Sequence, residues 1–358
     1  MTFTLNDEQR MLQDAARDFF REQAPVSRLR KMRDDKKNGR DPDLWREMAA
    51  MGWAGIVVPE EFGGAGLGYV GLGLVLEESG RTLAASPLHS SACAGASALM
   101  LAGTEAQKAE WLPKIASGEA VAALAVDEGA HHTPGNSALT FSNGKLSGAK
   151  AYVADGHLAD LFIVAGADAL YLVTGDAAGL TRRELITADS RGAADLTFDS
   201  TPAEPMQGGA DVVDSVLDRA RIGLAAEMLG AASEAFDITN EYLKTRRQFG
   251  QVIGGFQALQ HRAAKLFTDM ELTRSCVMAA LDALDRNAGN VAEYASLAKA
   301  RACETLHLAS NEMVQLHGGI GMTDEHDAGL YLKRARVAEA LYGGASFHRD
   351  RYARLMGF

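Results

Sequence analysis

The sequence predicts an α+β fold in which a strand-rich segment lies between two helical segments. Apolar residues recur at helical spacing before residue 120 and again after residue 206. Between these points, short apolar runs alternate with turn residues, which is typical of a small antiparallel barrel or sandwich. The expected domains are an N-terminal α-helical domain over residues 1–120, a middle β-domain over residues 121–206 and a C-terminal α-helical bundle over residues 207–358.

The first segment opens with a helix-start signal. Asn6 and Gln9 have the spacing of a capping box, and Leu12, Ala16 and Phe19 then recur at helical spacing. Further helices are expected over residues 44–51, 69–81 and 105–115, with a glycine-containing loop over residues 60–68.

Turn residues mark the middle segment. Asn143-Gly144 favours a type I′ turn between two strands of a hairpin. The strands expected here cover residues 121–126, 138–141, 145–153, 161–165, 170–173 and 194–198. In the last segment, a long helix should run into Tyr242, and further helices should cover residues 257–285, 292–316 and 328–342.

Composition narrows the class of protein. With 47% hydrophobic and 23% charged residues, the chain has the make-up of an ordinary globular protein. A net charge of -11 argues against nucleic acid as a partner, because phosphate backbones require concentrated Lys and Arg. No apolar run reaches the roughly 20 residues that would span a membrane.

The cysteines and the N-terminus indicate the compartment. Cys93, Cys276 and Cys303 are far apart and form no CxxC pair, so we expect neither a disulfide framework nor a metal site. The first residues lack the basic and then apolar order of a signal peptide. We therefore expect a cytoplasmic protein.

Two motifs carry the functional signal. Arg246-Arg247-Gln248-Phe249-Gly250 places paired cations and an aromatic ring at the end of a helical run, and Gln315-Leu316-His317-Gly318-Gly319-Ile320-Gly321 places glycines after another. Alone, the first is more often a solvated helix end and the second a turn. Together they look like two halves of a clamp for a dinucleotide pyrophosphate, because guanidinium groups bind phosphate bidentately and glycines let main chain approach a ligand.

These motifs, in this order, resemble the acyl-CoA dehydrogenase family. The likeness also includes the stretch from Pro59 to Gly68 and three short stretches around the helix before the strands, Gly103 to Lys108, Trp111 to Pro113 and Ser117 to Glu119. It implies two α-helical domains around a small middle β-barrel domain, with a C-terminal four-helix bundle. It also implies α,β-dehydrogenation of an acyl-CoA thioester, with FAD bound across a subunit interface.

The resemblance assigns residues to this cofactor. It implies that the ADP end of FAD meets Arg246, Gln248, Phe249, Gln257, Gln315, Gly318 and Gly319. Arg221 matches an arginine beside the substrate pocket of relatives and would make a supporting contact.

The catalytic base of the family is missing from both of its known positions. Where relatives have Tyr-Glu-Gly-Thr, this chain has Tyr342-Gly343-Gly344-Ala345, and the alternative position, on the long helix, is Ala220. Neither Gly343 nor Ala220 can accept a proton, so the catalytic residue is unknown. Asp218, Glu227, Glu339 and His348 are the substitutes that we consider, but Glu227 and Glu339 are expected to be solvated or paired surface groups and His348 a capping or surface residue.

The loops that hold the flavin ring in relatives also depart from the pattern. Residues 126–134 match the Thr-Glu-Pro-Gly-Ala-Gly-Ser-Asp motif poorly, and the Trp-Ile-Thr strand corresponds to Tyr152-Val153-Ala154, which loses the hydroxyl. The motifs for the ADP end of FAD are thus retained, whereas those for the flavin ring and the base are not. A division of labour between subunits explains this contrast: the chain would lend its ADP-binding surface to a second acyl-CoA dehydrogenase subunit that supplies the flavin loops and the base.

Some bacterial enzymes for sterol or bile-acid side-chain thioesters, which act in steroid degradation and contain two copies each of two subunits, resemble this arrangement. An electron-transfer flavoprotein would accept the electrons. Two alternatives remain open. One is a self-sufficient homo-oligomeric acyl-CoA dehydrogenase or related flavoenzyme with a non-standard base, and the other is a non-catalytic scaffold subunit that has lost its cofactor.

Overall fold

The computed structural model describes residues 4–358. By packing, this part of the chain forms two compact units. The bundle unit comprises the residues up to Arg28, Gly73–Ala84 and Leu224–Phe358, and the sheet unit comprises Leu29–Leu72 and Ala85–Gly223. Because packing groups the elements differently from their order in the sequence, the domain boundaries at residues 120 and 206 stay a prediction.

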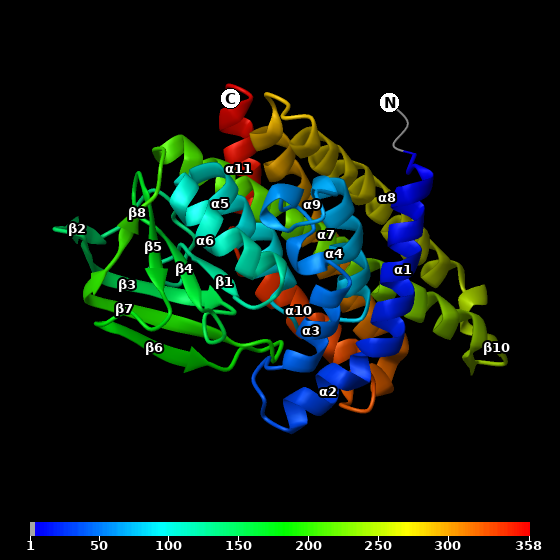
Figure 1. Cartoon of the computed structure of the whole chain (residues 1–358). Coiled ribbons are helices and arrows are strands. Elements are labelled where there is room, and N and C mark those ends of the chain that lie inside the picture. Colours follow the sequence, from blue (N-terminus) through cyan, green and yellow to red (C-terminus); the bar gives the residue numbers. More distant parts are fainter. Residues whose placement is uncertain (1–3) are drawn as a thin grey trace. The chain divides into compact units, whose positions relative to one another are not determined.

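The bundle unit is helical (Figure 1). Its elements are α1 (Asp7–Gln23), the end of α4 (Gly68–Arg81), α7 (Ala210–Thr245) from Leu224 onward, the short hairpin β9 (Arg247–Gln248) and β10 (Gln251–Val252), α8 (Gln257–Asp285), α9 (Val291–His317), the 3-10 turn η5 (Gly318–Met322), α10 (Ala328–Ala340) and α11 (Ala345–Leu355). α9 packs against α8, α10 and α11, so it is the central helix of this unit. The predicted capping box of the first helix is confirmed, since Asn6 and Gln9 exchange both hydrogen bonds.

Two close helix contacts in the bundle unit explain small residues of the sequence. A Cβ on Gly230 of α7 would lie 1.8 Å from the carbonyl oxygen of Glu77, and one on Gly80 of α4 would lie 2.0 Å from that of Glu227. The two helices therefore meet backbone to backbone, which only glycine permits at these positions.

The sheet unit combines short helices with two four-stranded sheets (Figure 1). The helices are most of α2 (Val26–Asp34), α3 (Pro42–Ala50), the π-helical segment η3 (Leu88–Gly95), α5 (Ala96–Ala102) and α6 (Glu105–Ala116). The strands are β1 (Ala122–Ala125), β2 (Thr140–Ser142), β3 (Lys145–Ala154), β4 (Leu161–Ala165), β5 (Leu170–Thr174), β6 (Leu180–Leu185), β7 (Ala193–Pro202) and β8 (Glu204–Pro205).

The strand order corrects one detail of the predicted fold. The two sheets of the sheet unit run β1-β4-β5-β8 and β2-β3-β7-β6, so its strands form two separate sheets and not a closed barrel. Apolar side chains from both sheets share one core, which includes Leu146, Phe162, Val173 and Leu196. The type I′ turn is confirmed, because Asn143 and Gly144 both have positive φ, 52° and 74°.

Several elements escaped the sequence patterns, among them α2, α5, β6, β8 and α11. β6 reads Leu-Thr-Arg-Arg-Glu-Leu and forms the edge of its sheet, paired only with β7, so its exposed charges conceal the strand alternation. α11 begins directly after Gly344, where a run of polar residues gives a weak helical signal. None of the helices in residues 4–358 combines the length and apolar character needed to cross a membrane.

Candidate functional site

The first half of the predicted clamp is a tight hairpin in the bundle unit. α7 ends at Thr245, Arg246 follows, and β9 pairs with β10. The turn residues Phe249 and Gly250 both have positive φ, 50° and 80°, as a type I′ turn requires. Phe249 is 89% exposed, so the hairpin presents an aromatic ring to its surroundings.

The second half is the glycine segment at the end of α9. Gly318 has φ 64° and ψ -134°, a conformation essentially restricted to glycine. Apart from the adjacent residues, no heavy atom of residues 4–358 lies within 4 Å of a Cβ placed on Gly318 or Gly319. The main chain is therefore open to close approach by a ligand.

Aromatic rings bring the two halves together within the bundle unit. Tyr242, in the last turn of α7, stacks on His317 with 4.3 Å between ring centroids. Its hydroxyl group also donates a 3.4 Å hydrogen bond to the carbonyl oxygen of His317, directly before Gly318. The hairpin and the glycine segment thus start from residues that touch.

The predicted cofactor residues fit the ADP end of a dinucleotide. All seven are exposed and belong to the bundle unit, namely Arg246, Gln248, Phe249, Gln257, Gln315, Gly318 and Gly319. Within residues 4–358, no side-chain hydrogen bond or ion pair occupies the Arg246 guanidinium. A cation, three amide side chains and open main chain are the groups that bind pyrophosphate well.

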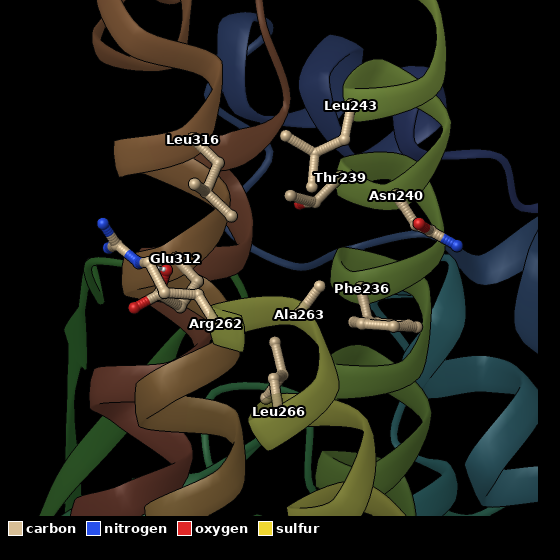
Figure 2. A pocket seen from close by; sticks show the side chains of 9 residues that line it. All are labelled: Phe236, Thr239, Asn240, Leu243, Arg262, Ala263, Leu266, Glu312 and Leu316. Atoms are coloured by element: carbon tan, nitrogen blue, oxygen red, sulfur yellow. Dashed lines mark hydrogen bonds and ion pairs between the residues drawn. The ribbon is translucent and has the colours of Figure 1, made fainter. Parts of the chain in front are cut away.

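A pocket lies next to these residues (Figure 2). It has about 230 Å³ including the open solvent at its mouth, and it lies between α7, α8 and α9. Leu243 and Leu316 face it from two helices, and Arg262 pairs with Glu312 at 2.7 Å on one side. Gln315 directly precedes Leu316, so the pocket adjoins the predicted nucleotide surface.

The segment that would hold the flavin ring is in the sheet unit, and its side chains bind one another. His132 lies 2.9 Å from Asp127 through Nδ1 and 3.1 Å from Nη2 of Arg221 through Nε2. Arg221 also forms a 2.9 Å ion pair with Asp218. Because a guanidinium only donates, Nε2 of His132 must accept and Nδ1 must carry the proton that Asp127 accepts. These four polar side chains therefore form one hydrogen-bonded network, in the order Asp127–His132–Arg221–Asp218.

Lys150 fixes the same segment from β3. Its ammonium group is buried and donates to the carbonyl oxygen of Val126 at 2.7 Å and to Glu128 at 2.8 Å. Burial lowers the pKa of Lys150, while Glu128 opposes that shift. Burial alone would raise the pKa of Glu128, but hydrogen bonds from Lys150, Ser137 and the Ala138 main chain outweigh it and lower this pKa.

These contacts bear on Arg221 and on the strand beside it. Arg221 is completely buried, and its guanidinium is committed to Asp218 and His132. A substrate contact by Arg221 stays a prediction and would require these bonds to rearrange. Tyr152, in contrast, is 58% exposed at a β-bulge with φ 53°.

The two residues at the base positions are held in place by buried polar groups. Ala220 is fully buried, and its carbonyl oxygen accepts a 2.8 Å hydrogen bond from His89 within the sheet unit. In the bundle unit, Gly343 has φ 100°, and its carbonyl oxygen accepts a 2.9 Å hydrogen bond from the buried Lys299. Lys299 also donates to the carbonyl oxygen of Ala338 at the end of α10.

The substitute bases are engaged elsewhere. Asp218 and Glu227 are buried in ion pairs with Arg221 and Arg334, the latter at 2.9 Å. Glu339 lies 3.2 Å from His307. His348, for which a surface or capping role was the stronger expectation, is instead fully buried, and its Nε2 donates to the Tyr342 carbonyl oxygen at 3.1 Å. None of these four residues is an exposed, unengaged base.

Comparison with known proteins places the chain in a family. The acyl-CoA dehydrogenase N-terminal domain model matches residues 6–119, and the C-terminal domain model matches residues 207–357. Acyl-CoA dehydrogenase IpdE2 of Mycobacterium tuberculosis is 34% identical over 339 residues, which cover 94% of this chain and 93% of the relative. The chain therefore belongs to the acyl-CoA dehydrogenase family, whose members are FAD-binding oxidoreductases that act on CH–CH bonds.

Two solved structures extend this finding. A Tcur3481-Tcur3483 steroid acyl-CoA dehydrogenase variant is 34% identical with a TM-score of 0.89, and the match covers 99% of this chain and 98% of that chain. A chain of the ChsE4-ChsE5 complex from Mycobacterium tuberculosis is 25% identical with a TM-score of 0.89, and the match covers 100% of this chain and 100% of that chain. Both structures are named for pairs of different proteins, so the chain resembles subunits of heteromeric enzymes.

Proposed function

We propose that this chain is a subunit of an FAD-dependent acyl-CoA dehydrogenase that contains two kinds of subunit. It supplies the ADP-binding half of a FAD site at a subunit interface, and a second acyl-CoA dehydrogenase subunit supplies the flavin-side loops and the carboxylate base. One contrast carries this proposal. The residues for the ADP end are exposed to solvent. In the flavin-side segment, by contrast, the polar side chains are bound to one another in the network Asp127–His132–Arg221–Asp218.

The residues of the bundle unit have distinct roles in this proposal. Arg246 binds the pyrophosphate with charge-assisted hydrogen bonds, and the main chain at Gly318 and Gly319 approaches the same group. Gln248, Gln257 and Gln315 supply amide hydrogen bonds, and Phe249 offers a ring face. FAD held by these residues would supply the hydride acceptor for the oxidation of the thioester.

The chain itself has no base to remove the α proton in this proposal. A general base must reach the substrate proton, whereas Gly343 and Ala220 carry no acidic group, and Asp218, Glu227 and Glu339 are engaged in ion pairs or polar contacts. The partner must therefore provide the carboxylate. This argument also speaks against a self-sufficient homo-oligomer.

The substrate class and the partners are inferred from the relatives. Similarity to a steroid acyl-CoA dehydrogenase supports a substrate in which the side chain of a sterol or bile acid is the acyl group of the CoA thioester. The paired names of both structures support a complex of two kinds of subunit, for which we propose a heterotetramer with two copies of each. Electrons would pass to an electron-transfer flavoprotein, and three free cysteines fit the reducing cytoplasm.

Co-purification tests the proposal. The chain is expressed alone and together with the acyl-CoA dehydrogenase subunit of its genomic neighbourhood, and visible absorption gives the ratio of FAD to protein. We expect the chain alone to retain little FAD and to show no turnover, and the pair to hold one FAD for each copy of this chain. A homo-oligomer with one tightly bound FAD per subunit and full turnover would overturn the proposal.

A further inference from the structure

We propose that Tyr242, His317 and His326 are positioning residues, whose stacked rings fix the two halves of the nucleotide surface in the arrangement that binds one pyrophosphate. The inference rests on the proposed function and assigns a role to residues outside the predicted contact set. None of the three has to touch the cofactor.

The stack joins the two halves at their origins. Tyr242 precedes Arg246 by four residues, and the Arg246 main-chain N–H donates to the Tyr242 carbonyl oxygen at 2.9 Å. His317 directly precedes Gly318 and is 4% exposed. The hydrogen bond from the Tyr242 hydroxyl group to the His317 carbonyl oxygen therefore links the peptide before the glycine segment to the turn of α7 before the hairpin.

A third ring extends the stack to α10. His326 also packs against His317, with 4.2 Å between the ring centroids. Its Nδ1 accepts a 3.1 Å hydrogen bond from the main-chain N–H of Ala328, the first residue of α10. His317 cannot rotate freely, because its Nδ1 donates a 2.7 Å hydrogen bond to the Met313 carbonyl oxygen. Three helices are thereby connected beneath one exposed surface.

The stack also makes this surface sensitive to acid. With Nδ1 of His317 bound to Met313, protonation must occur at Nε2, and it would place a cation in a buried stack. Burial lowers the pKa of His317, and the neighbouring His326 lowers it further. The titratable groups that face His317 are Tyr242 from α7 and His326 from the segment before α10; α9 presents the Met313 carbonyl oxygen, and η5 has no charged side chain.

Ring-conserving and ring-deleting variants separate positioning from simple packing. In the co-expressed complex, FAD affinity and thermal unfolding are measured for His317→Ala, His317→Phe and the control His307→Ala, which changes a half-exposed histidine of the same helix. We expect His317→Ala to weaken FAD binding about tenfold, because displaced binding groups would lose about one hydrogen bond to the pyrophosphate, and one such bond changes affinity by this order. His317→Phe should bind FAD nearly as the wild type does, and His307→Ala should be unchanged.

The pH profile supplies an independent readout. Wild-type FAD affinity should fall in mildly acidic buffer, and that fall should be absent in His317→Phe, which cannot be protonated. Unchanged FAD affinity in His317→Ala, or an acid response that persists in His317→Phe, would overturn the inference, and the second readout decides even if the alanine variant does not fold. If Arg246→Ala and His317→Ala both leave the FAD content unchanged, the proposed function itself is wrong. If Arg246→Ala loses FAD and His317→Ala does not, only the positioning role of the stack is wrong.

Discussion

Nη2 of Arg221 lies 3.1 Å from Nε2 of His132, inside the segment that would be open to flavin in a complete site. The opposite side of the guanidinium is paired with Asp218 at 2.9 Å. This arrangement neutralises a buried cation without any ligand, and a buried cation needs such partners. The sheet unit therefore stabilises this region with its own side chains.

Arg221→Ala tests how much these contacts of Arg221 with His132 and Asp218 stabilise the fold. The substitution leaves Asp218 buried without its cation, and breaking a buried ion pair in this way costs about 3–5 kcal/mol of unfolding free energy. Arg46→Ala is the matched control, because Asp43 and Arg46 have the same residue types and spacing but side chains 70% and 75% exposed. We expect the control to cost less than about 1 kcal/mol in denaturant unfolding. Equal effects would contradict the structural assignment.

Arg246→Ala tests the pyrophosphate contact. A charged hydrogen bond contributes about 1.5–3 kcal/mol, so FAD affinity of the co-expressed complex should fall roughly 10- to 100-fold. Arg247→Ala removes an equally exposed cation of the same hairpin, one residue further along, and should have a smaller effect. FAD titration followed by flavin fluorescence measures both variants. An unchanged affinity in Arg246→Ala would show that the pyrophosphate lies elsewhere.

Gly343→Ala tests the backbone at the lost base position. At φ 100°, a Cβ meets its own main chain, so alanine should destabilise the protein by about 1 kcal/mol or more. Gly329 provides the comparison, since it lies in α10 and no atom is within 4 Å of a Cβ built there. Gly329→Ala should be neutral or stabilise by up to about 1 kcal/mol. Thermal unfolding of the two variants should move in opposite directions or differ clearly.

His157 predicts a pH dependence of stability in the sheet unit. Its Nε2 donates a 2.6 Å hydrogen bond to the Asn38 carbonyl oxygen, and burial lowers its pKa below the ordinary 6.5. The unfolded chain thus takes up a proton more readily than the folded chain. The contribution of His157 is fully present above about pH 6.5 and is lost as the pH falls through the lowered value.

Unfolding free energies across this range measure the effect. His157→Gln should be less stable than the wild type at neutral pH and should show a smaller further loss in acid. His261→Gln, at an exposed position of α8, should follow the wild-type curve. A wild-type acid response that survives in His157→Gln would assign the titration to other groups.

Periodicity and turn chemistry carried most of the fold prediction. Asn143-Gly144 and the Asn6 capping box act locally, so neighbouring residues suffice to predict them. β4 and α8 were predicted at their observed bounds, because a short apolar run and a long helical pattern were both clear. β6 was missed because an exposed edge strand with charged residues has no apolar alternation.

The site divides in the same way. Arg246 and Gly318 could be singled out because their motifs are contiguous in sequence, and their contact with FAD stays a prediction. The hydrogen-bonded network of Asp127, His132 and Arg221 could not be predicted, because its residues come from a loop and a helix up to 94 residues apart. No local sequence pattern encodes such a contact. His317 and His326 are also a tertiary pair, although His317 stands directly before the glycines that were singled out.

The left-handed backbone at Tyr342 and Gly343 bears on the history of the enzyme. The φ values are 58° and 100°, and the carbonyl oxygens of Tyr342 and Gly343 accept hydrogen bonds from His348 and Lys299, so the backbone at Gly343 is fixed in a conformation that favours glycine. A single codon change to glutamate would meet a main chain that disfavours it. Under the proposed function, the need for a partner's carboxylate would therefore be hard to reverse by a substitution at this position.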